Sequence, residues 1–360
     1  MGERRLKMDI QLKQAGKFRY GPCPYCKSTA STFVVAADNS YRCMGCGRSG
    51  ILGENNTTEE EKAVTGGHRL YRLNEEAAKV FEKQLYEPSG RNALKYLERR
   101  GVKPDTIKQF RLGYAGTKGM DQVFIRAGFS ETELVDSGLF KKNEDGTLWF
   151  QLYGRVIYPI TDAMGLVIGF GGRVLDDTEP KYKNSPETEV FSKRENLYAW
   201  GFASASSHEH IILCEGYMDV ISMHQAGFDN AVASLGTALT EEQAQKIKSV
   251  ADYVIILYDT DGPGRKATAR AIEILRGAGI QAYVSDTLPA KDPDEFIVKY
   301  GAEKLQKKLR RAEDEKTYRL RLATDENGKT DFETVCDILL ENGADVESLV
   351  QKINKKRRSQ

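Results

Sequence analysis

The sequence has no apolar run near the ~20 residues that a membrane-spanning helix needs; its longest candidates are short, such as residues 253–258. No apolar stretch follows its basic start, so no secretory signal is expected. Cysteines are few, with six in 360 residues, and there are two tryptophans and four histidines. The content of 40% hydrophobic and 29% charged residues excludes a disordered chain. We therefore expect a cytoplasmic protein of about two to three domains.

The formal net charge is only +1, but the charge is unevenly distributed. Residues 1–50 contain nine basic and three acidic residues, so the rest of the chain is mildly acidic. A basic N-terminal module joined to an acidic body indicates a polyanionic partner. An ordinary solvated surface can have the same charge count, and the count alone does not separate the two interpretations.

Four of the six cysteines form two Cys-x-x-Cys pairs, Cys23/Cys26 and Cys43/Cys46, with sixteen residues between the pairs. Four thiolates satisfy the tetrahedral coordination of Zn²⁺, and this spacing is typical of zinc sites. The intervening residues are β-prone around a turn, which predicts a zinc ribbon. Since all four ligand positions are filled, we expect one structural Zn²⁺ that contributes to the folding of this small module. Disulfides or redox thiols are the alternatives, and a cytosolic chain disfavours them.

The ribbon also carries aromatic and basic side chains. Arg42 and Arg48 accompany Tyr25, Phe33 and Tyr41, a combination that can stack on unpaired bases. The alternative is that Phe33 and Tyr41 pack within the ribbon's own sheet, and for Phe33 this alternative is favoured.

The composition changes after Gly47 to Gly, Asn, Thr and Glu, which predicts a mobile linker through about Gly67. Helical patterns follow. We expect one helix capped by Asn74, a second over residues 92–100, and a third that starts at Pro104.

Alternating apolar residues and glycine turns predict two neighbouring antiparallel strands, over residues 154–160 and 166–174. The second strand contains Gly169-Phe-Gly-Gly172. A dinucleotide-binding fingerprint would need a third glycine at Val174 and a following helix, so a nicotinamide cofactor is not expected.

Residues from about 208 to 300 alternate strand-like and helical segments. This pattern is typical of a parallel sheet with helices on both faces. The strands are expected at residues 211–214, 231–233, 253–258 and 281–285.

Acidic side chains follow three of these four strands. They are Glu215 and Asp219 after the first, Asp259 and Asp261 after the third, and Asp292 and Asp294 after the fourth. Ligands of such sheets bind beyond the carboxyl ends of the strands, and carboxylates gathered there repel each other unless cations neutralise them. Their oxygens suit Mg²⁺, which also shares substrate phosphates. One such acid could simply cap a helix, but three placements favour a metal site.

These residues resemble a known family. Glu215-Gly-Tyr-Met-Asp219 with Asp259-x-Asp261-Gly is similar to the Toprim domain of bacterial primases, topoisomerases and some nucleases and recombination proteins. Several upstream segments look like the RNA polymerase core of DnaG-type bacterial and phage primases. They are residues 96–101, 112–115, 154–160, 169–173 and 180–187. The resemblance covers roughly residues 20–300, in the family's order.

The resemblance implies a DNA primase, a DNA-dependent RNA polymerase and nucleotidyltransferase that makes short RNA primers on single-stranded DNA for replication. The implied chemistry uses Mg²⁺ or Mn²⁺ to stabilise the attacking and leaving oxygens. Glu215, Asp259 and Asp261 would be the catalytic metal ligands. Support or a second metal would come from Asp219, Asp292 and Asp294. The implied partners are the template, ribonucleoside triphosphates and a separate replicative helicase, with no membrane.

The family also has a basic face for template and nucleotides. The matching residues here are Arg155, Arg173, Lys181, Tyr182 and Lys193. Tyr182 could stack on a base, whereas each cation taken singly is more often a solvated surface residue. The ribbon is implied to grip the template and help choose the start sequence.

The chain departs from the family in three respects. Cellular primases usually have a histidine in the first pair, whereas this chain has four cysteines, as some phage enzymes do. For a phage enzyme, the location would be the host cytoplasm. The leader before Cys23 is short. About fifty residues follow the Toprim domain, which we expect to be too few for the usual helicase-docking domain, and no motif of a fused helicase motor occurs.

Two rival functions stay open. One is a Toprim nuclease or topoisomerase-like strand breaker, although nothing singles out a catalytic tyrosine among the seventeen. The other is a non-enzymatic zinc/Toprim DNA-binding recombination mediator, a class without a counterpart of residues 150–195.

We therefore predict an α+β and α/β multidomain chain. Its predicted order is a β zinc ribbon template-binding domain (1–52), a flexible linker (53–72), a mixed α+β N-terminal part of the polymerase core (73–205), a Toprim α/β domain with a parallel sheet (206–310) and a short helical C-terminal segment (311–360).

Overall fold

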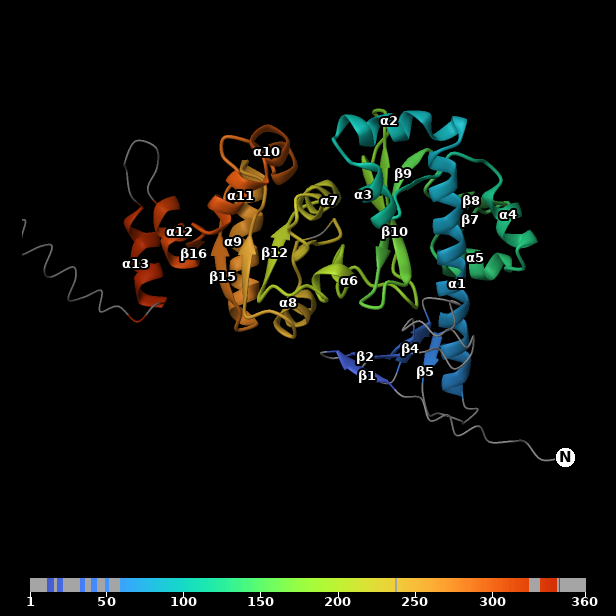
Figure 1. Ribbon diagram of the computed structural model, residues 1–360, viewed down its shortest axis with the longest axis horizontal. Coiled ribbons are helices and arrows are strands. Elements are labelled where there is room, and N and C mark those ends of the chain that lie inside the picture. Colours follow the sequence, from blue (N-terminus) through green and yellow to red (C-terminus); the bar gives the residue numbers. More distant parts are fainter. Residues whose placement is uncertain are drawn as a thin grey trace, which may run out of the picture. The chain divides into compact units, whose positions relative to one another are not determined.

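The computed structural model describes residues 12–15, 18–21, 33–35, 40–43, 49–51, 59–236, 238–323, 331–341 and 343 (Figure 1). The chain divides into two compact units, Met1–Leu73 and Asn74–Gln360. In the described ranges, no helix combines the length and the apolar character needed to cross a membrane.

The first unit contains a five-stranded antiparallel sheet in chain order. Its strands are β1 (Lys13–Ala15), β2 (Phe18–Gly21), β3 (Phe33–Val35), β4 (Ser40–Cys43) and β5 (Ser49–Ile51). Phe33 and Tyr41 are both buried, and their ring centroids are 4.9 Å apart. These two aromatic rings therefore belong to the core of the sheet and not to a base-stacking surface.

The predicted zinc site falls largely outside the described residues, where Cys23, Cys26 and Cys46 lie. Cys43 ends β4 and is paired in register with Phe33 of β3, as expected for a hairpin between the two cysteine pairs. The four-cysteine site stays a prediction.

Helix α1 (Glu59–Leu85) begins earlier than predicted. Asn74 is buried inside this helix, so its assignment as an N-cap is wrong. The physical reason is that Leu70, Leu73, Ala77 and Phe81 form one buried apolar stripe at helical spacing, which continues past Asn74 in both directions. The helix also includes residues 59–72 of the predicted linker.

The second unit contains a four-stranded sheet in the order β11-β10-β9-β6. Its strands are β6 (Gly113–Tyr114), β9 (Arg155–Thr161), β10 (Val167–Val174) and β11 (Tyr182–Asn184). The predicted antiparallel pair is confirmed as β9 and β10. Phe81 of α1 packs edge-to-face on Phe170 of β10, with centroids 5.4 Å apart.

Short helices and a hairpin surround this sheet. They are η1 (Pro88–Gly90), α2 (Arg91–Arg99), α3 (Pro104–Gln109), α4 (Met120–Arg126), α5 (Glu131–Asp136), β7 (Phe140–Lys142) and β8 (Leu148–Phe150). The predicted helices over 92–100 and from Pro104 are confirmed as α2 and α3.

The glycines of β10 serve packing. A Cβ on Gly171 would lie 2.4 Å from Cζ of Tyr217, and one on Gly169 would lie 3.2 Å from the ring of Phe191. Both sites lie within strand β10, whose register with β9 shifts between Val167 and Gly169, and no helix follows directly, so Gly169–Gly172 is not a dinucleotide-binding loop. These glycines let aromatic rings lie directly on the strand backbone.

The following sheet has the order β13-β12-β14-β15-β16. Its strands are β12 (His210–Cys214), β13 (Ala231–Ala233), β14 (Tyr253–Ile256), β15 (Gln281–Val284) and β16 (Glu313–Asp314). The four predicted strands are confirmed and are mutually parallel. The antiparallel edge strand β16 was missed, because two acidic residues carry no strand signal.

Helices accompany these strands along the chain. They are α6 (Trp200–Ala203), α7 (Tyr217–Gln225), α8 (Glu241–Lys248), α9 (Gly262–Gly277), α10 (Pro293–Tyr300), α11 (Ala302–Leu309), α12 (Glu315–Leu322) and α13 (Phe332–Glu341). One face of the sheet, including Leu213 and Ile256, packs in a core with α8 and α9. Ile212 and Ile255 point to the other face, beside Leu309 of α11. Burial on both faces explains why these strands are continuous apolar runs.

Candidate active site

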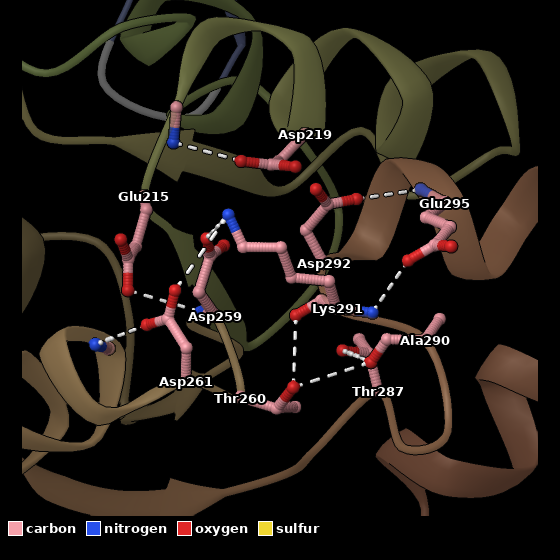
Figure 2. Close-up of polar contacts among 12 residues, drawn as sticks. Glu215, Asp219, Asp259, Thr260, Asp261, Thr287, Ala290, Lys291, Asp292 and Glu295 are labelled. Atoms are coloured by element: carbon pink, nitrogen blue, oxygen red, sulfur yellow. Dashed lines mark hydrogen bonds and ion pairs between the residues drawn. The ribbon is translucent and has the colours of Figure 1, made fainter.

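The predicted acids lie at the carboxyl ends of the parallel strands, each at the start of a helix or loop. Glu215 directly follows β12, and Asp219 lies in the first turn of α7. Asp259 follows β14, and Asp261 is the N-cap of α9. Asp292 is the N-cap of α10. Figure 2 shows these five carboxylates arranged around the side chain of Lys291.

Backbone N–H groups orient most of these acids. Glu215 Oε1 accepts a hydrogen bond from the Asp259 N–H at 3.1 Å, and Asp219 Oδ2 accepts one from the Gly216 N–H at 3.1 Å. Asp261 Oδ1 accepts from the Gly264 N–H at 3.0 Å. Each bond uses one oxygen and fixes the carboxylate, which leaves the second oxygen as a possible cation ligand.

Asp292 is fixed in the same way, because its Oδ1 accepts the Glu295 N–H at 2.7 Å. The same carboxylate can therefore cap a helix and still have an oxygen for a metal ion, so the two roles that the sequence presents as alternatives are compatible at Asp292. A capping carboxylate is held rigidly at the end of its helix, where its other oxygen can still face the centre of the cluster.

Gly264 makes the close approach of these loops possible. A Cβ at this position would lie 2.1 Å from the carbonyl oxygen of Asp259 and 2.9 Å from Oε1 of Glu215. No side chain larger than hydrogen fits there without moving two of the predicted metal ligands. The glycine in Asp259-Thr-Asp-Gly-Pro-Gly264 is therefore part of the architecture of the site.

Lys291 supplies a positive charge within the cluster. Its Nζ lies 3.2 Å from Oδ2 of Asp259 and 3.8 Å from Oδ2 of Asp261 (Figure 2). The bond to Asp259 raises the pKa of Lys291, so the amine stays protonated at neutral pH. A single lysine without a spacing pattern gave no signal in the sequence, except that it directly precedes Asp292-Pro-Asp294.

Burial raises the pKa of the Glu215 carboxyl, and the nearby Asp259 and Asp261 carboxylates raise it further. Burial also raises the pKa of Asp259, although the bond from Lys291 opposes this shift. The pKa of Asp219 lies well above its usual range because the group is buried and faces Asp292 and Asp259. The cluster thus holds more negative charge than its surroundings neutralise, which is the condition for binding a cation.

The carboxylates are of the chemical type that a hard divalent ion prefers, but they are not drawn together around one point. In the described part of the chain, no group of three or more His, Cys, Asp or Glu side chains is gathered closely enough to hold a metal ion. Yet Asp259 and Asp261 already share one cation, the ammonium of Lys291. Carboxylate oxygens at the ends of adjacent strands are the ligands that Mg²⁺ and Mn²⁺ prefer.

Asp294 has different surroundings from the other acids. Its side chain is only 4% exposed and forms an ion pair with Arg100, in which the Arg100 Nε lies 2.8 Å from Oδ2. Its other oxygen, Oδ1, accepts a hydrogen bond from the hydroxyl of Ser222. Both oxygens therefore have protein partners.

The residues of the predicted basic face differ in how deeply they are buried. Arg155 is only 5% exposed, and its Nη1 donates to the carbonyl oxygens of Gly172, Pro180 and Lys181 at 2.9–3.3 Å. Burial lowers the pKa of Arg155. These contacts tie β9 to β10 and to the segment that follows it, a role that charge in the sequence does not indicate.

Arg173 and Tyr182 lie together. The Arg173 guanidinium is 4.4 Å from the ring centroid of Tyr96 and 5.6 Å from that of Tyr182. Tyr182 is 39% exposed, which leaves part of its ring accessible. Lys181 is exposed and Lys193 is half-buried. The sequence places Tyr96 in a predicted helix and in the segment 96–101 that resembles the primase core, but nothing in its spacing indicates this contact.

Tyrosines join this region to α7. The rings of Tyr158 and Tyr217 are stacked at 4.9 Å, and the Tyr217 hydroxyl donates to Oδ1 of Asn184 at 2.6 Å. Tyr182 and Tyr217 are 6.1 Å apart. Because Tyr217 lies two residues from both Glu215 and Asp219, the stack connects the aromatic end of the basic face to the acidic cluster.

Comparisons with known proteins match this architecture. A family model described as the DNA primase catalytic core, N-terminal domain, matches residues 80–204, and a Toprim-like model matches residues 212–297. A solved structure of a DnaG primase catalytic domain bound to ssDNA is 32% identical, with a TM-score of 0.66, and the match covers 74% of this chain and 87% of that one. The chain belongs to the DnaG-type DNA primases.

Other relatives agree with this family assignment. A DNA primase of Clostridium acetobutylicum is 37% identical over 358 residues, covering 91% of this chain and 59% of that protein. A structure of the zinc-binding and RNA polymerase domains of the Aquifex aeolicus primase is 28% identical, with a TM-score of 0.67 and coverage of 88% and 84%. This DnaG-type chain thus spans between about half and three fifths of the length of its curated relatives.

Proposed function

We propose that this chain is a DNA primase that synthesises short RNA primers on single-stranded DNA. The observation that carries the proposal is the cluster of oriented carboxylates at the carboxyl edge of the Toprim sheet, in a chain whose family is that of the primases. The ssDNA bound to the catalytic domain of one relative supports the choice of template. The substrates would be ribonucleoside triphosphates.

The central ligands would be Glu215, Asp259 and Asp261, with Asp219 and Asp292 as further or second-metal ligands. Bound Mg²⁺ or Mn²⁺ would supply Lewis-acid stabilisation of the attacking and leaving oxygens during nucleotidyl transfer. The contribution of the protein to this chemistry is to hold the metal ligands in position. Backbone N–H groups hold Glu215, Asp261 and Asp292 in place before a substrate arrives, so little reorganisation is needed during the reaction.

We assign Asp294 the supporting role among the six acids. Its two oxygens are used by Arg100 and Ser222, so the residue would position α10 and thereby Asp292. This assignment separates the Asp292-Pro-Asp294 motif into a cation ligand and a structural anchor.

The template and nucleotides would contact Arg173, Lys181, Tyr182 and Lys193. Lys181 and Tyr182 are exposed and Lys193 is half-buried, whereas Nε and Nη1 of the half-buried Arg173 are covered. The buried Arg155 would instead hold the strands beneath them. A planar guanidinium flanked by two tyrosine rings suits phosphate or base contacts, since cations bind phosphate and aromatic rings stack on bases.

The zinc ribbon, with Cys23, Cys26, Cys43 and Cys46 on one structural Zn²⁺, would grip the template and contribute to the choice of start site. A separate replicative helicase would be the partner, and the cytoplasm, of a host cell if the source is a phage, would be the place of action. The zinc-binding domain of the Aquifex aeolicus relative supports the zinc assignment.

An assay separates this proposal from its rivals. Full-length protein is incubated with single-stranded DNA, labelled ribonucleotides and Mg²⁺ or Mn²⁺, and both strands are analysed. Short RNA products on intact DNA support a primase. Cleaved DNA without RNA would indicate a strand breaker, and DNA binding without either product would indicate a recombination mediator.

A further inference from the structure

The backbone of Lys291 is fixed from two sides. Its carbonyl oxygen accepts hydrogen bonds from the N–H of Thr260 at 3.0 Å and from the Thr260 hydroxyl at 3.2 Å. Its own N–H donates to Oε2 of Glu295 at 2.7 Å. The loop between β15 and α10 is thereby tied to the loop that carries Asp259 and Asp261 (Figure 2).

The side chain of Lys291, in contrast, has a route to solvent. It is 58% exposed, whereas its partner Asp259 is 17% exposed. The ammonium can therefore leave the carboxylates by rotation of its own side chain, without unfolding of the fixed backbone. The contact is an ion pair at the rim of the cluster, and such pairs break at modest cost.

Lys291 and a divalent ion would compete for the same oxygens. The ammonium bonds to Asp259 and lies near Asp261, two of the three proposed central ligands. Positive charges a few ångströms apart repel each other, so the ammonium and a metal ion cannot both be held there at full strength. A lysine with a fixed Cα and a released side chain stays within reach of any anion that arrives with the metal.

We propose that Lys291 is a resident cation that the catalytic metal displaces, and that the displaced ammonium then binds the triphosphate of the incoming nucleotide. This inference rests on the proposed function. Lys291 would then couple the two binding steps. It would weaken binding of the metal alone and strengthen binding of the nucleotide that follows. A merely structural lysine would not have opposite effects on the two ligands.

The test compares the zinc-loaded full-length protein with Lys291→Met, which keeps the length of the side chain and removes its charge. Mn²⁺ binding without nucleotide or template is followed by electron paramagnetic resonance. We expect Lys291→Met to bind Mn²⁺ about three- to tenfold more tightly, as expected for loss of one competing charge at a partly exposed site. At saturating Mn²⁺, we expect its affinity for a non-hydrolysable nucleoside triphosphate to fall by a similar factor.

The matched control is Lys308→Met. Lys308 also pairs with one aspartate, Asp286, at 2.8 Å and is 32% exposed, but Asp286 is not one of the acids of the cluster. Lys308→Met should change neither the affinity for Mn²⁺ nor the affinity for the nucleoside triphosphate. Glu215→Gln should abolish the measured Mn²⁺ binding, which would locate that binding in the cluster.

The outcomes are distinguishable. Tighter Mn²⁺ binding with weaker nucleotide binding supports the inference. Unchanged or weaker Mn²⁺ binding by Lys291→Met, while the wild type binds Mn²⁺ and makes RNA, overturns it and leaves the proposed function intact. Tighter Mn²⁺ binding with unchanged nucleotide affinity overturns the triphosphate contact. A wild type that neither binds Mn²⁺ nor makes RNA contradicts the proposed function itself.

Discussion

The carboxylate of Asp294 is held by the guanidinium of Arg100, a residue 194 positions earlier in the chain. Arg100 is the C-cap of α2 in the region matched by the primase N-terminal model, and Asp294 lies in the first turn of α10 in the Toprim-like region. Ser222 of α7 bonds to the same carboxylate. One buried acid thus joins α7, α10 and the end of α2 beside the acidic cluster.

Asp294→Asn should therefore destabilise the protein more than it weakens metal binding. Loss of the buried ion pair should cost about 2 kcal/mol, less than the value for a fully buried pair because Arg100 is one-third exposed. Urea unfolding followed by circular dichroism measures the loss, and Mn²⁺ titration of the folded variant measures affinity. If stability is unchanged while Mn²⁺ binding is lost, Asp294 is a metal ligand and not an anchor.

Gly264→Ala should disrupt the cluster. Its Cβ would collide with the Asp259 carbonyl oxygen and press on Glu215, so both ligands must move. We expect Mn²⁺ affinity and RNA synthesis to fall at least about tenfold, since small displacements of reacting groups are costly. The control is Gly277→Ala in the same helix, where an added Cβ meets nothing within 4 Å. Equal behaviour of the two variants would contradict the proposed packing.

The raised pKa of Glu215 predicts a pH dependence of stability without added divalent cations. Its pKa is higher in the folded chain than in the unfolded one, so its contribution to stability is full at low pH and is lost as the pH rises through the folded pKa. Glu215→Gln should therefore unfold at a temperature about 1–3 °C higher near neutral pH, although we expect it to lose primer synthesis. The difference should shrink towards about pH 4.

The control for this pH series is Glu303→Gln, an exposed acid of α11. Its unfolding temperature should follow that of the wild type at every pH. A Glu215→Gln variant that is less stable than the wild type near neutral pH would show that the carboxylate stabilises the fold, contrary to the account given above.

Arg173→Gln should weaken single-stranded DNA binding. The guanidinium lies over Tyr96 and near Tyr182, and we expect it to contact one template phosphate. Fluorescence anisotropy at several salt concentrations should show about tenfold weaker binding. The slope of the logarithm of the binding constant against the logarithm of the salt concentration should become shallower by about 0.7. Arg321→Gln removes an exposed arginine paired with Glu313 and should leave binding unchanged. An unchanged salt dependence in Arg173→Gln would exclude the phosphate contact.

The sequence indicated the sheet and its acids well, because both depend on local patterns. Apolar runs mark strands that are buried on both faces, and a carboxylate that follows such a run lies at the carboxyl edge whatever the rest of the chain does. The acids Glu215, Asp259 and Asp261 were located in this way, and the structure places them on that edge.

Properties that depend on distant contacts were not predictable. Charge in the sequence does not report burial, so Arg155 was grouped with surface cations although it bonds to three carbonyl groups inside the fold. Lys291 and Arg100 carry no spacing pattern, and their partners are brought to them only by tertiary structure. Asn74 was assigned by its capping propensity, which the apolar stripe of α1 overrides.

The most direct test of the central claim compares the wild type with Asp259→Asn in primer synthesis, with DNA binding measured in parallel. We predict that the wild type makes short RNA on single-stranded DNA only when Mg²⁺ or Mn²⁺ is present. Asp259→Asn should bind the same DNA normally but lose at least about 99% of synthesis, since one central ligand is removed. Undiminished synthesis by Asp259→Asn would contradict the account, because the carboxylates at the edge of the Toprim sheet would then not be the catalytic site.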